Sequence, residues 1–278
     1  MNSSIVSAKA SDLITAAERR EYEYVCSKFL SPAEQIEYYN TVCRSGHGLS
    51  SRCFFYGGAP GADRRLCIIV PSYLDLSNAE APSVFSSSRE EYFHRLCTEN
   101  DALGELDIVP LRIQGSGFKV LTHRDYMGSI LSLGIERDVI GDIAVTDPNS
   151  AVVFTLGIIA PYIRESLTKI GRDGIRIEEF DIPRDFMIPR KFEKKTVIAA
   201  SDRIDSIVAA ITGVSRAAAK ELCASGVVEL NYMSATQGDT RVCPDDTISV
   251  RGYGKYIIES FVGVTGSGRA RISVKKYI

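Results

Sequence analysis

The spacing of apolar residues divides the sequence into three regions. The first region contains both helical and strand patterns. Residues 11–45 have the spacing of two helices. Ser31-Pro32 marks the start of the second, because Ser is a good N-cap and Pro suits the first helical position. Apolar runs on both sides of the turn sequence APGAD are typical of a β-hairpin. The pattern predicts an N-terminal α/β module over residues 1–76.

The second region, residues 77–181, begins with a Ser-rich stretch and continues as a regular alternation of periods. Residues 77–104 contain only a short helical stretch, and we interpret them as an insertion. From residue 105 the pattern predicts strands at 106–113, 141–146, 151–156 and 174–180 and helices at 122–134 and 160–171. This β-α-β-β-α-β order is that of a ferredoxin-like (RRM-like) domain. Its strands lack the aromatic signature of RNA-recognition motifs, so base stacking on this sheet is not expected.

The third region contains two short amphipathic helices joined by a tight turn. Apolar residues from Ile204 to Ile211 recur at helical spacing, Gly213 ends this helix, and Ser215 is a good N-cap for the next. The sequence VVELNY then alternates as a strand. Residues 182–198 hold two prolines and several cations, and we expect them to connect the domains. Cations at helix starts and on exposed helix faces favour contact with phosphate oxygens.

This order of residues resembles the S4 RNA-binding domain. The resemblance rests on the R-x-D opening at Arg203 and Asp205, the Ser215-Arg216 start of the second helix, and the strands GVVELN and DTISVRG. It implies that residues 182–278 are a linker plus an S4 domain that binds structured RNA. The residues expected to form the RNA surface are Arg203, Asp205, Ser215, Arg216, Lys220, Asn231, Arg251 and Lys255.

A wider resemblance covers roughly residues 50–278. The segments LTHRDYMGSILSLGIERDVIGDI and IIAPYIRESLTKIG, followed by an S4 domain, are similar to the YlmH family of bacterial S4 proteins, which also occurs in plastids. The family resemblance implies ribosome association, with rRNA and tRNA bound on a large subunit that carries peptidyl-tRNA, in the rescue of stalled nascent chains. The alternative is a protein-interaction adaptor in cell division or ribosome assembly, with weak RNA affinity.

The charge distribution agrees with an anion-binding C-terminal part. The 278 residues have a formal net charge of −2, but residues 186–278 hold 14 Lys and Arg against 9 Asp and Glu. The remaining residues hold 19 basic against 26 acidic side chains. The seven cysteines are scattered without metal-ligand spacing, which favours reduced thiols. With no signal-like start and no long apolar run, we expect a soluble cytoplasmic protein, without membrane contact and monomeric when free.

No catalytic motif emerges from the sequence. His123-Arg124-Asp125 resembles a kinase catalytic loop in three letters only, since the required Asn is absent. We interpret His123 and Arg124 as candidate ribosome contacts at a helix start. The glycine-rich segment 57–63 lacks the G-K-[ST] that grips nucleotide phosphates. The sequence therefore predicts a protein that is not an enzyme, with no cofactor and no metal site.

Overall fold

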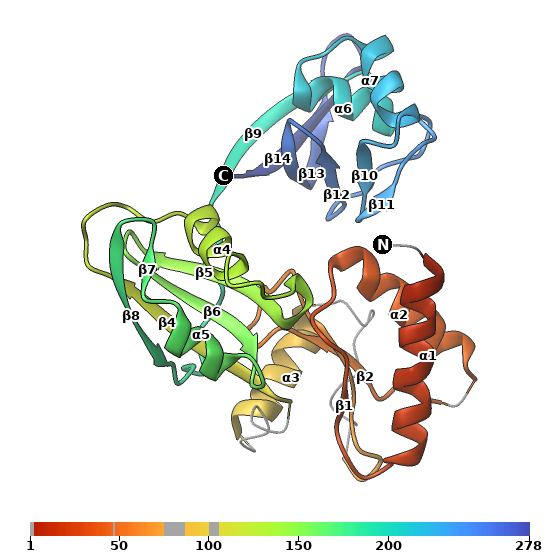
Figure 1. The fold of residues 1–278 in the computed structure, drawn as a ribbon. Helices are drawn as coiled ribbons and strands as arrows, with labels where there is room; N and C mark the ends of the chain where they lie inside the picture. The colour runs from red at the N-terminus through yellow and green to blue at the C-terminus, as the bar shows by residue number, and fades with distance from the viewer. Residues whose placement is uncertain (1–2, 47, 75–86, 100–105) are drawn as a thin grey trace. The chain divides into compact units, whose positions relative to one another are not determined.

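The computed structural model describes residues 3–46, 48–74, 87–99 and 106–278. The chain forms two compact units, residues 1–189 and residues 190–278 (Figure 1). Helices and three separate sheets occur together, with strand orders β1-β3-β2, β5-β6-β4-β8-β7 and β11-β10-β12-β13-β14-β9. This mixture is the α+β class that an α/β module, a ferredoxin-like domain and an S4 domain together predict. In the described part of the chain, none of the helices has both the length and the apolar character needed to cross a membrane.

The first unit begins with two helices on a three-stranded sheet. Helix α1 (Ser3–Arg19) and helix α2 (Pro32–Arg44) pack over β1 (Val25–Cys26), β2 (Cys53–Tyr56) and β3 (Leu66–Ile69). Ser31 and Glu34 form a capping box at the start of α2, as the Ser-Pro sequence predicts. The predicted hairpin is confirmed by the antiparallel pairing of β2 with β3.

The prediction of continuous helix up to residue 30 is wrong. Helix α1 ends at Arg19, and Val25 and Cys26 pair with Ile69 and Ile68 as the edge strand β1. Val25 of this edge strand is buried in the core that the sheet forms with α1 and α2. Long-range pairing thus overrides the local helical pattern.

The next sheet has the predicted β-α-β-β-α-β order. It contains β4 (Ile108–Gly115), α4 (His123–Leu131), β5 (Ile140–Asp147), β6 (Ser150–Leu156), α5 (Ala160–Ser166) and β8 (Asp173–Glu179), with the short β7 (Lys169–Ile170) paired to β8. All neighbouring strands are antiparallel. Residues of α4 and α5 pack on one face of this sheet.

The opposite face of the same sheet is covered over β5 and β6. Phe154 of β6 lies in one core with Phe29, Phe54 and Phe93, and every residue of β6 is buried. Phe93 comes from α3 (Ser87–Glu99), the helical part of the stretch that we interpret as an insertion, and its side chain fills this core. Residues 77–86 and 100–104 lie outside the described residues. This core contains side chains from both sides of the domain boundary expected between residues 76 and 77, such as Phe54 and Phe93.

The second unit is a six-stranded antiparallel sheet with two helices on one face. Its elements are β9 (Phe192–Ala199), α6 (Ile204–Thr212), α7 (Arg216–Ala224), β10 (Val228–Leu230), β11 (Met233–Ser234), β12 (Thr247–Val250), β13 (Gly254–Val264) and β14 (Ala270–Tyr277). The expected connector over residues 182–198 is corrected here. Ile188 is buried in the core of the first unit, and Phe192–Ala199 pairs with β14 along its whole length.

Candidate nucleic-acid interface

The predicted helix pair is present, and local sequence explains each of its ends. Helix α6 starts after Arg203 and ends at Gly213, whose φ of 79° lies in the left-handed region that glycine adopts without strain. The hydroxyl of Ser215 accepts a hydrogen bond from the backbone N–H of Ala218 at 3.2 Å and so caps α7. Ser215 therefore uses its side chain to begin the helix.

The starts of the two helices meet at the carboxylate of Asp205. Arg203 donates hydrogen bonds from Nε and Nη2 to the two carboxylate oxygens at 3.2 and 3.1 Å. The Nε of Arg216 lies 3.6 Å from the same carboxylate. The side chain of Asp205 is 4% exposed, whereas those of Arg203 and Arg216 are 40% and 55% exposed. A buried anion thus holds two outward guanidinium groups side by side.

Electrostatics keeps this carboxylate charged. Burial opposes the charged form of Asp205, but the hydrogen bonds from Arg203 and the positive charge of Arg216 outweigh burial, so the pKa of Asp205 is lowered. The sequence predicts Asp205 in the RNA surface. The structure places it beneath that surface, where it orients the arginines. Lys220 is exposed one turn along α7 from Arg216 and extends the positive side of the helix pair.

Asn231 has an internal role in the structure. Its Nδ2 donates to Asp246 at 2.8 Å, and its Oδ1 accepts from the backbone N–H of Thr247 at 2.9 Å. Its φ of 50° is one that Asn tolerates better than most residues. The side chain therefore fixes the turn after β10 to the start of β12. These two hydrogen bonds fix the orientation of its amide.

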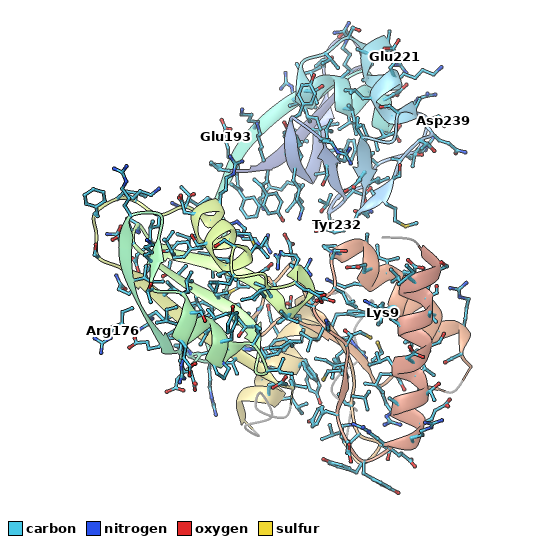
Figure 2. The ribbon with its side chains drawn as sticks, in the orientation of Figure 1. Lys9, Arg176, Glu193, Glu221, Tyr232 and Asp239 are labelled. Carbon is cyan, nitrogen blue, oxygen red and sulfur yellow. The ribbon has the colours of Figure 1, made fainter. Side chains whose placement is uncertain are left out.

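Lys255 lies between two aromatic rings on the sheet. Its Nζ is 4.7 Å from the ring centroid of Tyr232 and 4.6 Å from that of Tyr277. Tyr232 lies in the turn between β10 and β11 (Figure 2), and Tyr277 ends β14. No local sequence pattern indicates this arrangement, because Lys255 and Tyr277 are brought together only by the pairing of β13 with β14.

Arg251 is exposed in the turn between β12 and β13, beside a cavity of about 370 Å³. Glu229, Ser249 and Lys255 also line this cavity. Two cations, Arg251 and Lys255, and one carboxylate, Glu229, therefore line this cavity. The turn that separates them contains Gly252, whose φ is 88°.

His123 and Arg124 are exposed at the start of α4, in the first unit. The helix start is fixed by a capping box in which Asp125 accepts a hydrogen bond from the backbone N–H of Thr122 at 2.9 Å. Lys119 Nζ lies 3.0 Å from Asp125. The hydrogen bonds from Thr122 and Lys119 lower the pKa of Asp125 to about 2. Asp125 is thus committed to the cap, and the two residues before it project from a rigid helix start.

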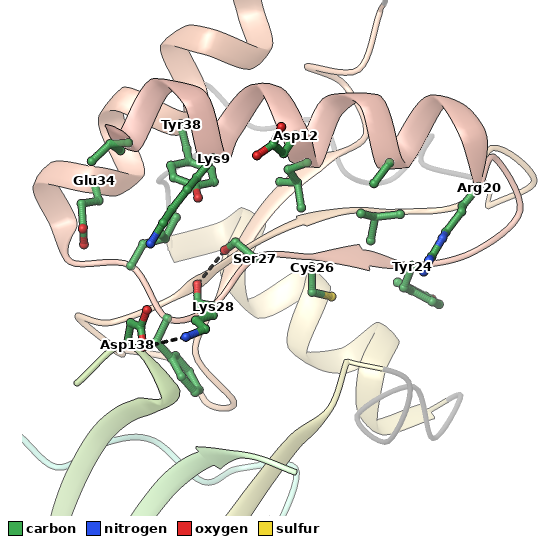
Figure 3. Close-up of a pocket in the computed structure, with 16 residues that line it drawn as sticks. Lys9, Asp12, Arg20, Tyr24, Cys26, Ser27, Lys28, Glu34, Tyr38 and Asp138 are labelled. Atoms are coloured by element: carbon green, nitrogen blue, oxygen red, sulfur yellow. Dashed lines mark hydrogen bonds and ion pairs between the residues drawn. The ribbon is translucent and has the colours of Figure 1, made fainter. Parts of the chain in front are cut away.

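A second cavity, of about 460 Å³, lies between α1 and residues 24–30 (Figure 3). Lys9 and Asp12 line it from α1, and Lys28 lies opposite with its Nζ 3.1 Å from Asp138. Burial raises the pKa of the Cys26 thiol to about 12, so this thiol is not a reactive thiolate. Side chains of both charge signs line this cavity, which does not favour binding of a phosphate group. Within the described ranges, His, Cys, Asp and Glu side chains form no group of three that could hold a metal ion.

The chain is similar to known RNA-binding and ribosome-associated proteins. Residues 105–184 match a family described as "Putative RNA-binding domain in YlmH". The chain is 22% identical over 259 residues to ribosome-associated protein quality control protein P2 of Bacillus subtilis (strain 168), a match that covers 93% of this chain and 89% of that protein. The resemblance to the YlmH family is confirmed. A solved structure, cell division protein ylmH from Streptococcus pneumoniae, matches with 21% identity and a TM-score of 0.43, over 63% of this chain and 89% of that chain.

The region matched to the YlmH domain runs from β4 to β8 and includes His123 and Arg124. The helix pair lies in the other unit. Two separate parts of the chain therefore carry features that point to RNA: one is similar to an RNA-binding family model, and the other holds the paired arginines.

Proposed function

We propose that this protein binds structured rRNA, and tRNA with it, on the large ribosomal subunit that carries peptidyl-tRNA, and acts without catalysis in the rescue of stalled nascent chains. Residues 190–278 are the proposed S4-type RNA-binding domain. Residues 106–180 form the proposed ferredoxin-like domain that positions it. The observation that carries the proposal is the pair of guanidinium groups held together by Asp205 at the joined starts of α6 and α7.

Phosphate recognition explains this arrangement. A planar guanidinium can bind two oxygens at once, and its charge persists at every physiological pH. Arg203 and Arg216 are half-exposed, so each keeps N–H groups for a ligand while Asp205 fixes its direction. Lys220 adds a third positive charge on the same helix pair. Contacts of this kind recognise the backbone of a folded RNA more than its sequence.

The name of the Bacillus relative, which includes ribosome association and quality control, supports the ribosome as the site of action. The second candidate function is a protein-interaction adaptor in cell division or ribosome assembly. It is favoured by the exposed apolar side chains of Phe118 and Val120, which a protein partner could cover. The two functions differ in their dependence on salt. Binding through phosphates weakens steeply as salt rises, whereas docking on a protein through apolar contacts changes little.

A sucrose-gradient sedimentation at two salt concentrations separates these functions. We expect the full chain to sediment with the large subunit at low salt and to dissociate as salt rises. Arg203→Ala with Arg216→Ala should abolish most of this sedimentation. Arg19→Ala with Arg20→Ala is the matched control, since it removes two exposed arginines from the other unit. Salt-insensitive sedimentation that both double variants retain would favour the adaptor and contradict the proposal.

A further inference from the structure

The segment between β4 and α4 is a short loop that is anchored at both ends. The backbone N–H of Gly115 donates to Asn149 at 2.7 Å, and that of Ser116 donates to Gly174 at 3.0 Å. At the other end, the N–H of Leu121 donates to Pro148 at 2.8 Å, and the Leu121 side chain is buried. Residues 117–120, here called the 117–120 loop, are therefore held between two fixed points.

The 117–120 loop exposes large apolar side chains. Phe118 is 74% exposed and Val120 is 66% exposed. A single apolar residue on a surface needs no explanation. Here, however, two such residues stand on one anchored loop, and one is an aromatic ring that belongs to none of the cores of its unit. The ends of the loop are fixed, and the ring is open to solvent and to a partner.

One cation lies on this loop and another on the helix start that the loop contacts. Lys119 follows Phe118 directly and lies 3.0 Å from Asp125 at the start of α4, which places the loop against that helix start. Arg124 is exposed on the same first turn. An exposed ring beside exposed cations matches the surfaces that bind unpaired RNA, where rings stack on bases and cations contact the phosphates.

Part of the sheet surface of this domain is covered by other elements and closed to a base. The sheet face opposite α4 and α5, on which RNA-recognition motifs stack bases, is buried over β5 and β6 by Phe29, Phe54 and Phe93. On β4 of that face, Arg112 lies over the ring of Phe180, 4.1 Å from its centroid. The 117–120 loop lies outside this covered part of the sheet, within the region that matches the RNA-binding domain model.

We propose that Phe118 stacks on an unpaired base of the bound RNA while Arg124 contacts a phosphate next to that base. This inference rests on the proposed function, since it assumes an RNA ligand. It adds a second contact, specific for unpaired nucleotides, to the phosphate contact of the helix pair. The ligand class is a structured RNA with a single-stranded loop or bulge.

The test uses the full chain and an RNA hairpin with 2-aminopurine in its unpaired loop, beside a fully paired duplex. Stacking on Phe118 should quench or shift the fluorescence of the probe. Phe118→Ala should abolish this change and weaken hairpin binding by about 5- to 150-fold, the range expected for one lost base–aromatic stack. Duplex binding should stay the same. Phe118→Tyr should retain both signals, and Val120→Ala, the matched control on the same loop, should leave both intact.

Each other outcome is informative. If wild-type protein binds both RNAs, and Phe118→Ala changes neither the fluorescence nor the affinity, the inference is wrong and the proposed function remains in place. Wild-type protein that binds neither RNA overturns the proposed function as well. If Phe118→Ala lowers sedimentation with ribosomes but not hairpin binding, the ring docks on a protein, and the inference is wrong.

Discussion

Replacement of Asp205 by Asn separates two effects that a negative charge can have beside an RNA surface. The carboxylate orients Arg203 and Arg216, but it also repels phosphate. If its charge alone mattered, Asp205→Asn would strengthen RNA binding. If orientation matters more, as we expect, the variant should bind RNA more weakly although the surface has become more positive.

The effect on stability can be worked out from the geometry. Asn has the shape of Asp, but its amide nitrogen would face a guanidinium N–H, a donor against a donor. Hydrogen bonds to charged groups contribute about 1.5–3 kcal/mol, and the released guanidinium groups are half-exposed and return to water. We therefore expect Asp205→Asn to lower the free energy of unfolding by about 1–2 kcal/mol.

This stability difference should depend on pH. The pKa of Asp205 is lowered in the folded protein, so the unfolded chain binds the proton more readily. The stabilisation is then complete above the ordinary Asp pKa and is lost as the pH falls through the lowered one. Urea unfolding should show the full difference between wild type and variant at about pH 7, and a smaller one at about pH 3.

Fluorescence anisotropy with a labelled structured RNA completes this test. Asp205→Asn should weaken RNA binding while circular dichroism shows an unchanged fold. Asp205→Glu offers a control that keeps the charge and moves the carboxylate. A variant Asp205→Asn that binds RNA as tightly as wild type, or more tightly, refutes the view that Asp205 orients the arginines.

Three further predictions concern single positions. The hydroxyl of Tyr126 is buried and has no hydrogen-bond partner among the described residues, whereas that of Tyr56 donates to Gly58 at 2.7 Å. Urea unfolding should therefore show Tyr126→Phe to be neutral or stabilising, and Tyr56→Phe to cost about 1–3 kcal/mol. Gly252→Val places a β-branched residue at a φ of 88°, which should cost about 1–2 kcal/mol and weaken RNA binding by anisotropy; an intact variant makes this turn an ordinary loop. Arg124→Ala should lower ribosome sedimentation without changing the urea midpoint, and an unchanged sedimentation argues against a contact there.

Local patterns predict the helix pair well because its ends are set by neighbours in sequence. Gly213 ends one helix and Ser215 caps the next, each through contacts within one turn. The helical spacing of Ile204 and Ile207 also marks the buried face of the first helix. The β-α-β-β-α-β order follows for the same reason, since its periods change sharply between elements.

Long-range pairing explains what local patterns miss. Residues 192–199 resemble a charged linker, but they form β9 because β14 pairs with them along their whole length. The short helical pattern of residues 87–99 likewise does not show that Phe93 fills a core with residues from distant parts of the chain.

The sequence likewise predicts some features of the candidate site and not others. The motif places Arg203 and Arg216 correctly at the helix starts. It cannot show that Asp205 lies beneath them, that Asn231 binds the start of β12, or that Tyr277 comes to lie beside Lys255. These three facts depend on how the strands and helices pack, which only the folded chain determines.

The most direct test of the central claim is the salt dependence of RNA binding by the full chain. A plot of log affinity against log salt should fall steeply for wild type, and its slope should be smaller by about two units in Arg203→Ala with Arg216→Ala, one for each lost phosphate contact. Arg203→Lys with Arg216→Lys should keep most of the slope with lower affinity, because charge remains but the two-oxygen fork is lost. Equal slopes and equal affinities in wild type and the alanine double variant, with its fold verified, would contradict the account.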